Sequence, residues 1–122
     1  MNSYLQAVHN FHKKFSAIVY KTPTTDIPDE LRQFRIQIMR EELKELEEAM
    51  KEKNLSHLAK EAADVLYTVL GTIETYGLTE KFDAIFEEVH QSNMSKDVTE
   101  TGKAKKGTSY KEADIEKILK KN

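Results

Sequence analysis

Two pairs of acidic residues at helical spacing constrain the fold of this chain more than any other feature of its sequence. Glu42 and Glu45 form one pair, and Glu61 and Asp64 form the other. A spacing of three residues puts both members of a pair on one face of a helix. The second pair lies at the start of a mostly apolar stretch, residues 62–73, and a helix that is hydrophobic nearly all round is buried. A buried carboxylate is costly unless it pairs with a cation or coordinates a metal.

Two compensations for these carboxylates are open. If the two helices pack antiparallel, the four carboxylates converge, and a hard divalent cation with oxygen ligands, Mg²⁺ or Mn²⁺, is the simplest partner. The alternative is a structural salt bridge between Asp64 and Arg35, Arg40 or Lys60. Glu41, Glu42 and Glu45, taken alone, would be interpreted as part of a solvated helix face. Aspartate is a poor residue for the middle of a helix, which favours a specific role for Asp64.

Helical periodicity accounts for most of the chain. Apolar residues recur at helical spacing over about residues 3–19, 30–53, 56–76 and 80–91, and a short last helix is expected over about 111–120. Gly77 is well placed to end the third helix, whereas residues 93–110 are rich in polar residues and lysine and show no periodicity. The sequence therefore predicts an all-α fold. We expect a bundle of four main helices with an irregular basic C-terminal segment and a short last helix, in a single domain over residues 1–122.

The composition of the chain excludes several classes of function. A formal net charge of −2 over 122 residues gives no general electrostatic basis for binding nucleic acid. There is no cysteine, and hence no disulfide framework or thiolate metal site. Neither a signal-peptide core nor a membrane-spanning apolar run is present, so we expect a cytoplasmic protein with no membrane partner. The wide apolar surface of the third helix predicts a homodimer or a higher homo-oligomer.

The spacing of the acidic residues resembles the signature of a known superfamily. Glu41-Glu42-x-x-Glu45, then 15 residues (46–60), then Glu61-x-x-Asp64, is similar to the EExxE…ExxD pattern of the all-α nucleotide pyrophosphohydrolases. This MazG-like superfamily includes phosphoribosyl-ATP pyrophosphohydrolases and dimeric all-α dUTPases. Residues 90–96 (HQSNMSK) and the basic residues 102–110 (GKAKKGTSY) resemble the segments that follow the third core helix in some members. The resemblance covers about residues 30–119.

This resemblance implies a role for each matching residue. Four of them match the ligands of Mg²⁺ or Mn²⁺: Glu42, Glu45, Glu61 and Asp64. Glu41 matches the first glutamate of the signature, which orients or deprotonates the attacking water. Residues expected to bind the substrate are Asn93 and Lys96, with Lys103, Lys105, Lys106 and Tyr110 as weaker candidates that act in their own subunit or in a neighbouring one.

The reaction implied by the resemblance is hydrolysis of a nucleoside triphosphate, (d)NTP, to (d)NMP and pyrophosphate, as in house-cleaning of the nucleotide pool. Its chemistry suits the residues, because phosphoryl transfer needs mainly positioning and charge neutralisation, and divalent ions bridge carboxylates and phosphates. Two alternatives stay open. One is a non-catalytic helical bundle that acts as an interaction or regulatory module, and the other is hydrolysis of phosphoribosyl-ATP.

Two weaker signals favour structural interpretations. Glu87-x-x-His90 has the spacing of a ferritin-like di-iron ligand pair, but such sites need two of these motifs and the chain has one. His9 and His12 share a helix face, and a solvated or half-buried pair is favoured there over a pair of metal ligands.

Overall fold

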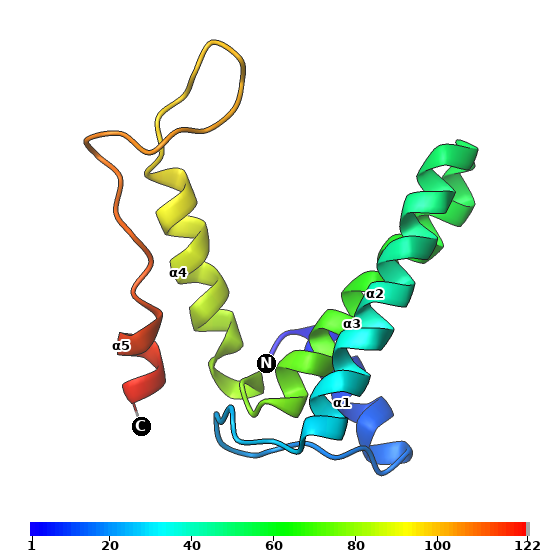
Figure 1. Cartoon of the computed structure of the whole chain (residues 1–122). Coiled ribbons are helices and arrows are strands. Elements are labelled where there is room, and N and C mark those ends of the chain that lie inside the picture. The colour runs from blue at the N-terminus through cyan, green and yellow to red at the C-terminus, as the bar shows by residue number, and fades with distance from the viewer. Residues whose placement is uncertain (122) are drawn as a thin grey trace. The chain divides into compact units, whose positions relative to one another are not determined.

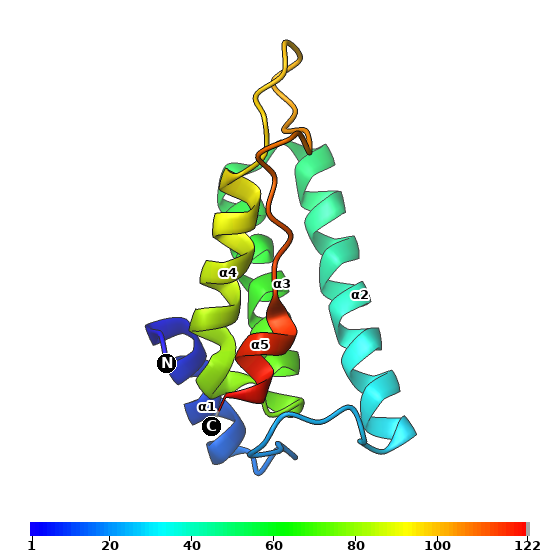
Figure 2. The same ribbon diagram turned by 90° about the vertical axis from the view of Figure 1, so that its left-hand side faces the viewer.

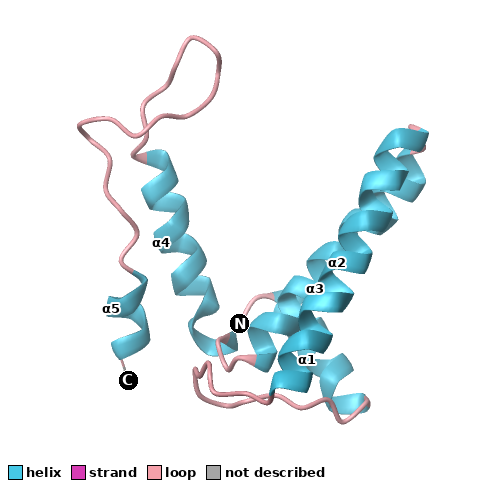
Figure 3. Ribbon diagram, viewed as in Figure 1, coloured by secondary structure: helices cyan, strands magenta, loops and turns pink. Residues whose placement is uncertain are grey.

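The computed structural model of the chain describes residues 1–121 and is built from helices (Figures 1 and 3). Its elements are α1 (Ser3–Lys14), α2 (Asp29–Glu52), α3 (Leu55–Thr75), the 3₁₀ turn η1 (Thr79–Lys81), α4 (Phe82–Met94) and α5 (Ile115–Lys120). Residues 1–121 contain no β-strand, only an isolated antiparallel bridge between Asp97 and Lys105. The predicted all-α class is therefore confirmed.

The chain divides into two compact units, Met1–Thr79 and Glu80–Asn122, and each is described by itself. The single domain expected over residues 1–122 stays a prediction. None of the described helices combines the length and the apolar character that a membrane crossing requires.

A helical hairpin of α2 and α3 forms the main body of the first unit. Helix α2 ends where Lys53 adopts a left-handed conformation (φ 57°), and the side chain of Asn54 caps α3 by accepting a hydrogen bond from the His57 backbone N–H at 3.1 Å. A two-residue connection makes the helices antiparallel neighbours, and both views show them side by side (Figures 1 and 2). Both helices lie within one residue of their predicted ranges.

Gly77 ends α3, as its position in the sequence predicts. Its φ of +73° belongs to the left-handed region, and its N–H donates to the carbonyl of Glu74 at 3.0 Å. The Leu78 N–H donates to the carbonyl of Ile73 at 3.1 Å, which completes a Schellman motif. A Cβ at residue 77 would lie 2.1 Å from the carbonyl oxygen of Thr22, so the close approach of this loop also requires glycine.

Helix α1 is shorter than the sequence predicts. It ends at Lys14 rather than near residue 19, because Ser16 adopts a positive φ of 54° that cannot continue a right-handed helix. Leu5 and Val8, on the face that is buried, are 0% and 1% exposed. Ile18 lies beyond the helix and stays exposed, so the apolar periodicity overstated its length.

A buried carboxylate on α3 binds two histidines of α1. Nδ1 of His12 lies 2.9 Å from Oε1 of Glu74, and Nδ1 of His9 lies 3.1 Å from Oε2. The side chains of His12 and Glu74 are both nearly inaccessible to solvent, whereas that of His9 is half exposed. The histidine pair expected to be solvated or half-buried therefore belongs to a polar cross-link between two helices.

The apolar surface of α3 is only partly buried. Leu70 and Ile73 are buried, but Leu66, Tyr67 and Val69 are about 40% exposed. As expected from its wide apolar surface, the helix is not covered on every side within the first unit. The homo-oligomer expected from this surface stays a prediction.

The second unit contains α4, the basic segment and α5. Helix α4 continues to Met94, three residues beyond its predicted end, and the last helix begins at Ile115 rather than Lys111. The Asp114 side chain caps α5 by accepting from the Lys117 N–H, and Lys81 donates to the carbonyls of Ile118 and Leu119 near its end.

We expect Glu74→Ala to destabilise the first unit by about 1–3 kcal/mol, because it leaves the buried ring of His12 without its hydrogen-bond partner. The matched control is His9→Ala, which removes the half-exposed partner and should cost less than about 1 kcal/mol. Urea unfolding followed by circular dichroism measures both values. Equal stability of Glu74→Ala and the wild type would show that the cross-link contributes nothing net.

Candidate functional site

Three carboxylates from the two arms of the hairpin converge. Glu42 and Glu45 lie on α2, Glu61 lies on α3, and one carboxylate oxygen from each residue falls within 4.8 Å of the others. The face that the sequence assigned to each helix is therefore the face turned toward the other helix. Below, these three residues are named the carboxylate cluster.

Two members of the carboxylate cluster are removed from solvent, Glu61 fully and Glu42 in part, whereas Glu45 is exposed. Glu61 is only 4% exposed, and Oε2 of Glu42 and Oε2 of Glu61 are buried without a hydrogen-bond partner in the described part of the chain. Buried polar atoms of this kind are rare, and each calls for an explanation such as an ion. Oxygen donors in this number fit a hard cation such as Mg²⁺ or Mn²⁺, which binds carboxylates in preference to softer ligands.

The electrostatics of Glu42 reflect the same crowding. Burial raises the pKa of its carboxyl above the ordinary value, and the negative charges of Glu45, Asp64 and Glu61 raise it further. Both causes disfavour the ionised form. A cation between these side chains would remove that penalty.

Asp64 stands outside the carboxylate cluster. Its Oδ2 lies 2.7 Å from Nζ of Lys60 in an i,i+4 ion pair, and its side chain is 33% exposed. Lys60 is thus the partner of Asp64 among the three basic residues that the sequence offers. Arg35 instead donates to the Thr72 hydroxyl at 3.1 Å and to the Thr68 carbonyl at 2.8 Å. The charge of Asp64 still raises the pKa of Glu42, and the role of Asp64 as a metal ligand stays a prediction.

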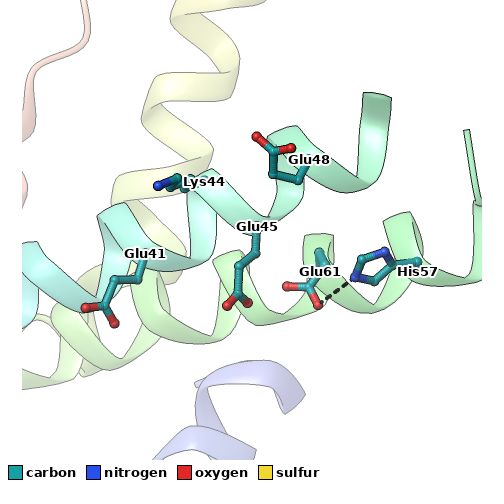
Figure 4. Close-up of a pocket in the computed structure, with 6 residues that line it drawn as sticks. All are labelled: Glu41, Lys44, Glu45, Glu48, His57 and Glu61. Carbon is teal, nitrogen blue, oxygen red and sulfur yellow. Dashed lines mark ion pairs between the residues drawn. The ribbon is translucent and has the colours of Figure 1, made fainter. Parts of the chain in front are cut away.

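Two members of the carboxylate cluster, Glu45 and Glu61, line an open hollow of about 530 Å³. Figure 4 shows the residues that line it, which are Glu41, Lys44, Glu45, Glu48, His57 and Glu61. Glu41 is exposed, and its Oε1 accepts a hydrogen bond from Nε2 of Gln37 at 2.9 Å. The hollow is of the size of small-molecule sites, and Glu41 lies on its wall, one turn from Glu45.

His57 is the member of this site that the sequence reasoning missed. Its Nδ1 lies 2.7 Å from Oε2 of Glu52, and its Nε2 lies 3.4 Å from Oε1 of Glu61, the contact dashed in Figure 4. The hydrogen bond with Glu52 is the main cause that raises the pKa of His57. The signal was present in the sequence, because a histidine four residues before an expected ligand lies on the same helix face.

The residues expected to bind the substrate lie in the second unit. Asn93 is in the last turn of α4, and Lys96 follows that helix. The loop beyond it is closed by backbone hydrogen bonds between Asp97 and Lys105, and Nζ of Lys106 lies 5.1 Å from the centre of the Tyr110 ring. Lys103 is exposed in this loop. The roles of these residues in binding stay predictions.

The chain was compared with known proteins. The model of a family described as phosphoribosyl-ATP pyrophosphohydrolase matches residues 8–93, which include the whole hairpin and its carboxylate cluster. A search of curated proteins found no match.

Glu42→Gln is expected to stabilise the metal-free protein near pH 7. Because the pKa of Glu42 is raised from its ordinary value of 4.5, the folded chain holds this proton more tightly than the unfolded chain. Stability therefore falls as the pH rises from 4.5 through the raised pKa, and the variant escapes this loss.

Urea unfolding in EDTA at pH 7 and at about pH 4 checks this prediction, since the advantage of the variant should shrink as the wild-type carboxyl is protonated in both states. Glu47→Gln is the control. Glu47 is an exposed glutamate of the same helix whose Oε1 lies 3.6 Å from Nζ of Lys51, so removing its charge should not stabilise the protein. No difference between Glu42→Gln and the wild type at either pH would contradict it.

Proposed function

We propose a substrate class and a cofactor from one premise, which is that the chain belongs to the phosphoribosyl-ATP pyrophosphohydrolase family. This family is part of the MazG-like all-α superfamily, so the chain is a pyrophosphohydrolase, a hydrolase that acts on phosphoric anhydrides. The proposal is that it depends on Mg²⁺ or Mn²⁺ and hydrolyses a nucleoside triphosphate to the monophosphate and pyrophosphate.

The observation that carries the proposal is the pair of buried carboxylate oxygens without partners, on Glu42 and Glu61. They belong to the carboxylate cluster, in which one oxygen from each residue lies within 4.8 Å of the others, and Glu45 and Glu61 of this cluster line an open hollow. An acidic surface without an ion would keep these oxygens in water. The arrangement is therefore better suited to binding a cation than to solubility alone.

The chain's own residues would have two roles in this reaction, which are to hold the cation and to accept a proton. Glu42, Glu45 and Glu61 would hold the cation, with Asp64 joining them if it leaves Lys60. The bound cation would neutralise phosphate charge and make water a better nucleophile near neutral pH. Glu41 would accept the proton of the attacking water on the wall of the hollow, where Gln37 holds its Oε1.

Two substrates share the triphosphate end that this chemistry requires. The first is a (d)NTP, cleaved to (d)NMP in house-cleaning of the nucleotide pool. The second is phosphoribosyl-ATP, which the description of the matching family favours. A non-catalytic bundle with an ion-stabilised fold is the competing proposal, and it predicts metal-dependent stability without release of pyrophosphate.

A homodimer or higher homo-oligomer belongs to the same proposal. It is supported by the apolar side chains that α1 and α3 leave exposed, among them Phe11, Leu66 and Tyr67. In such an assembly, the basic segment would act in its own subunit or in the neighbouring one.

The test is a panel of NTPs, dNTPs and phosphoribosyl-ATP with Mg²⁺ or Mn²⁺, in which pyrophosphate and orthophosphate are measured separately. We expect pyrophosphate from at least one substrate, and a loss of turnover of about 100-fold or more in Glu61→Gln because one ligand of the cation is gone. Glu48→Gln is the matched control, since Glu48 lines the same hollow but lies outside the carboxylate cluster.

Two outcomes would count against the proposal. Orthophosphate as the first product would exclude cleavage next to the α-phosphorus. Equal losses in Glu61→Gln and Glu48→Gln would show that general negative charge, rather than the carboxylate cluster, supports activity.

The basic segment gives a second prediction. Lys96→Ala and a Lys105/Lys106 double alanine variant should raise KM and lower kcat/KM about tenfold, because each lysine offers a point charge to a phosphate. Metal affinity should be unchanged. The control is Lys117→Ala on α5, and wild-type kinetics for both test variants would exclude the basic segment from the site.

A further inference from the structure

His57 connects the end of α2 to a member of the carboxylate cluster. It occupies the first turn of α3, where its backbone N–H is held by the Asn54 cap. Its Nδ1 lies 2.7 Å from Oε2 of Glu52, the last residue of α2, and its Nε2 lies 3.4 Å from Oε1 of Glu61. The ring therefore lies between two carboxylates: Nδ1 is hydrogen-bonded to Glu52, and Nε2 faces Oε1 of Glu61 at ion-pair distance.

The two oxygens of Glu61 have different surroundings. Oε1 lies beside two basic groups, Nε2 of His57 at 3.4 Å, which is charged when the ring is protonated, and Nζ of Lys60 at 3.5 Å. Oε2 is buried and has no hydrogen-bond partner in the described part of the chain. The contacts at Oε1 thus fix the rotation of the carboxylate and leave Oε2 without competition from a protein donor.

The two basic groups beside Oε1 are not equivalent. Lys60 is 68% exposed, its flexible chain ends in a point charge, and its shorter contact is with Asp64 at 2.7 Å. His57 is rigid, is 39% exposed, and is anchored at its other nitrogen by Glu52. Lys60 also donates to Oε1 at 3.5 Å, but the anchored ring is the more rigid of the two neighbours and so the better suited to orient Glu61.

We propose that His57 is a positioning residue that orients Glu61 for binding of the divalent cation, and that Glu52 sets the orientation of the His57 ring. This inference rests on the proposed function, because it assumes that the carboxylate cluster holds a metal. Hydrogen-bonding partners outside the ligand shell commonly orient carboxylates and histidines in metal sites. Here the order is Glu52, His57, Glu61 and then the cation.

A purely electrostatic role for His57 makes the opposite prediction. In its protonated form, a ring 3.4 Å from Glu61 repels a metal ion, so an electrostatic role predicts that removing the ring strengthens cation binding. Orientation predicts weaker binding. The sign of the change therefore separates the two roles.

The experiment is titration of the full chain with Mn²⁺ at constant pH and without nucleotide, read by calorimetry. We expect His57→Asn to weaken Mn²⁺ binding about tenfold or more, because a shorter amide keeps the donor toward Glu52 but does not reach Glu61. His57→Gln should bind within about threefold of the wild type, since its amide nitrogen lies where Nε2 lay. Lys60→Gln is the charge control and should not weaken binding.

Each result has a defined meaning. Binding by His57→Asn that equals or exceeds that of the wild type would overturn the inference, as would equal weakening in the asparagine and glutamine variants. Circular dichroism confirms that both variants are folded. Failure of the wild-type chain to bind Mn²⁺ would overturn the proposed function itself, which keeps the two failures distinguishable.

Discussion

Mutual repulsion among the carboxylates of Glu42, Glu45 and Glu61 is the constraint to which the rest of the first unit is fitted. Two unit charges at the 4.8 Å limit of this cluster repel each other by roughly 3.5 kcal/mol at an effective dielectric constant of 20. The α2–α3 hairpin holds them together against this repulsion by its apolar packing and its short connection. Such a stored cost is typical of sites in which function, rather than stability, sets the residues.

The basic groups around the carboxylate cluster are arranged unevenly. His57 and Lys60 both lie beside Oε1 of Glu61, and Lys60 also pairs with Asp64. Neither is in contact with Glu42, whose Oε2 stays unpartnered and whose pKa is raised by burial and by like charges. The basic side chains therefore lie beside Glu61, whereas Glu42 has no basic partner among the described ion pairs. A mobile cation would be drawn to Glu42.

The sequence predicted the parts of this arrangement that depend on local periodicity. Glu42, Glu45 and Glu61 were identified because a spacing of three is a helical face, and Gly77 because a left-handed residue ends a helix. Ser16 was missed because its left-handed conformation follows no sequence rule for serine. The buried contacts of Glu74 with two histidines depend on which side chains meet between helices, which periodicity alone does not determine.

The two residues between α2 and α3, Lys53 and Asn54, determine how the two helices of the site are aligned with each other. All members of the carboxylate cluster lie on the two arms that this turn joins, so its length fixes the rotational phase of one arm against the other. One inserted residue that extended α3 would turn Glu61 by about 100° and shift it by about 1.5 Å. Surface loops usually tolerate insertions, but an insertion in this connection would separate Glu61 from Glu42 and Glu45, although neither residue of the connection belongs to the carboxylate cluster.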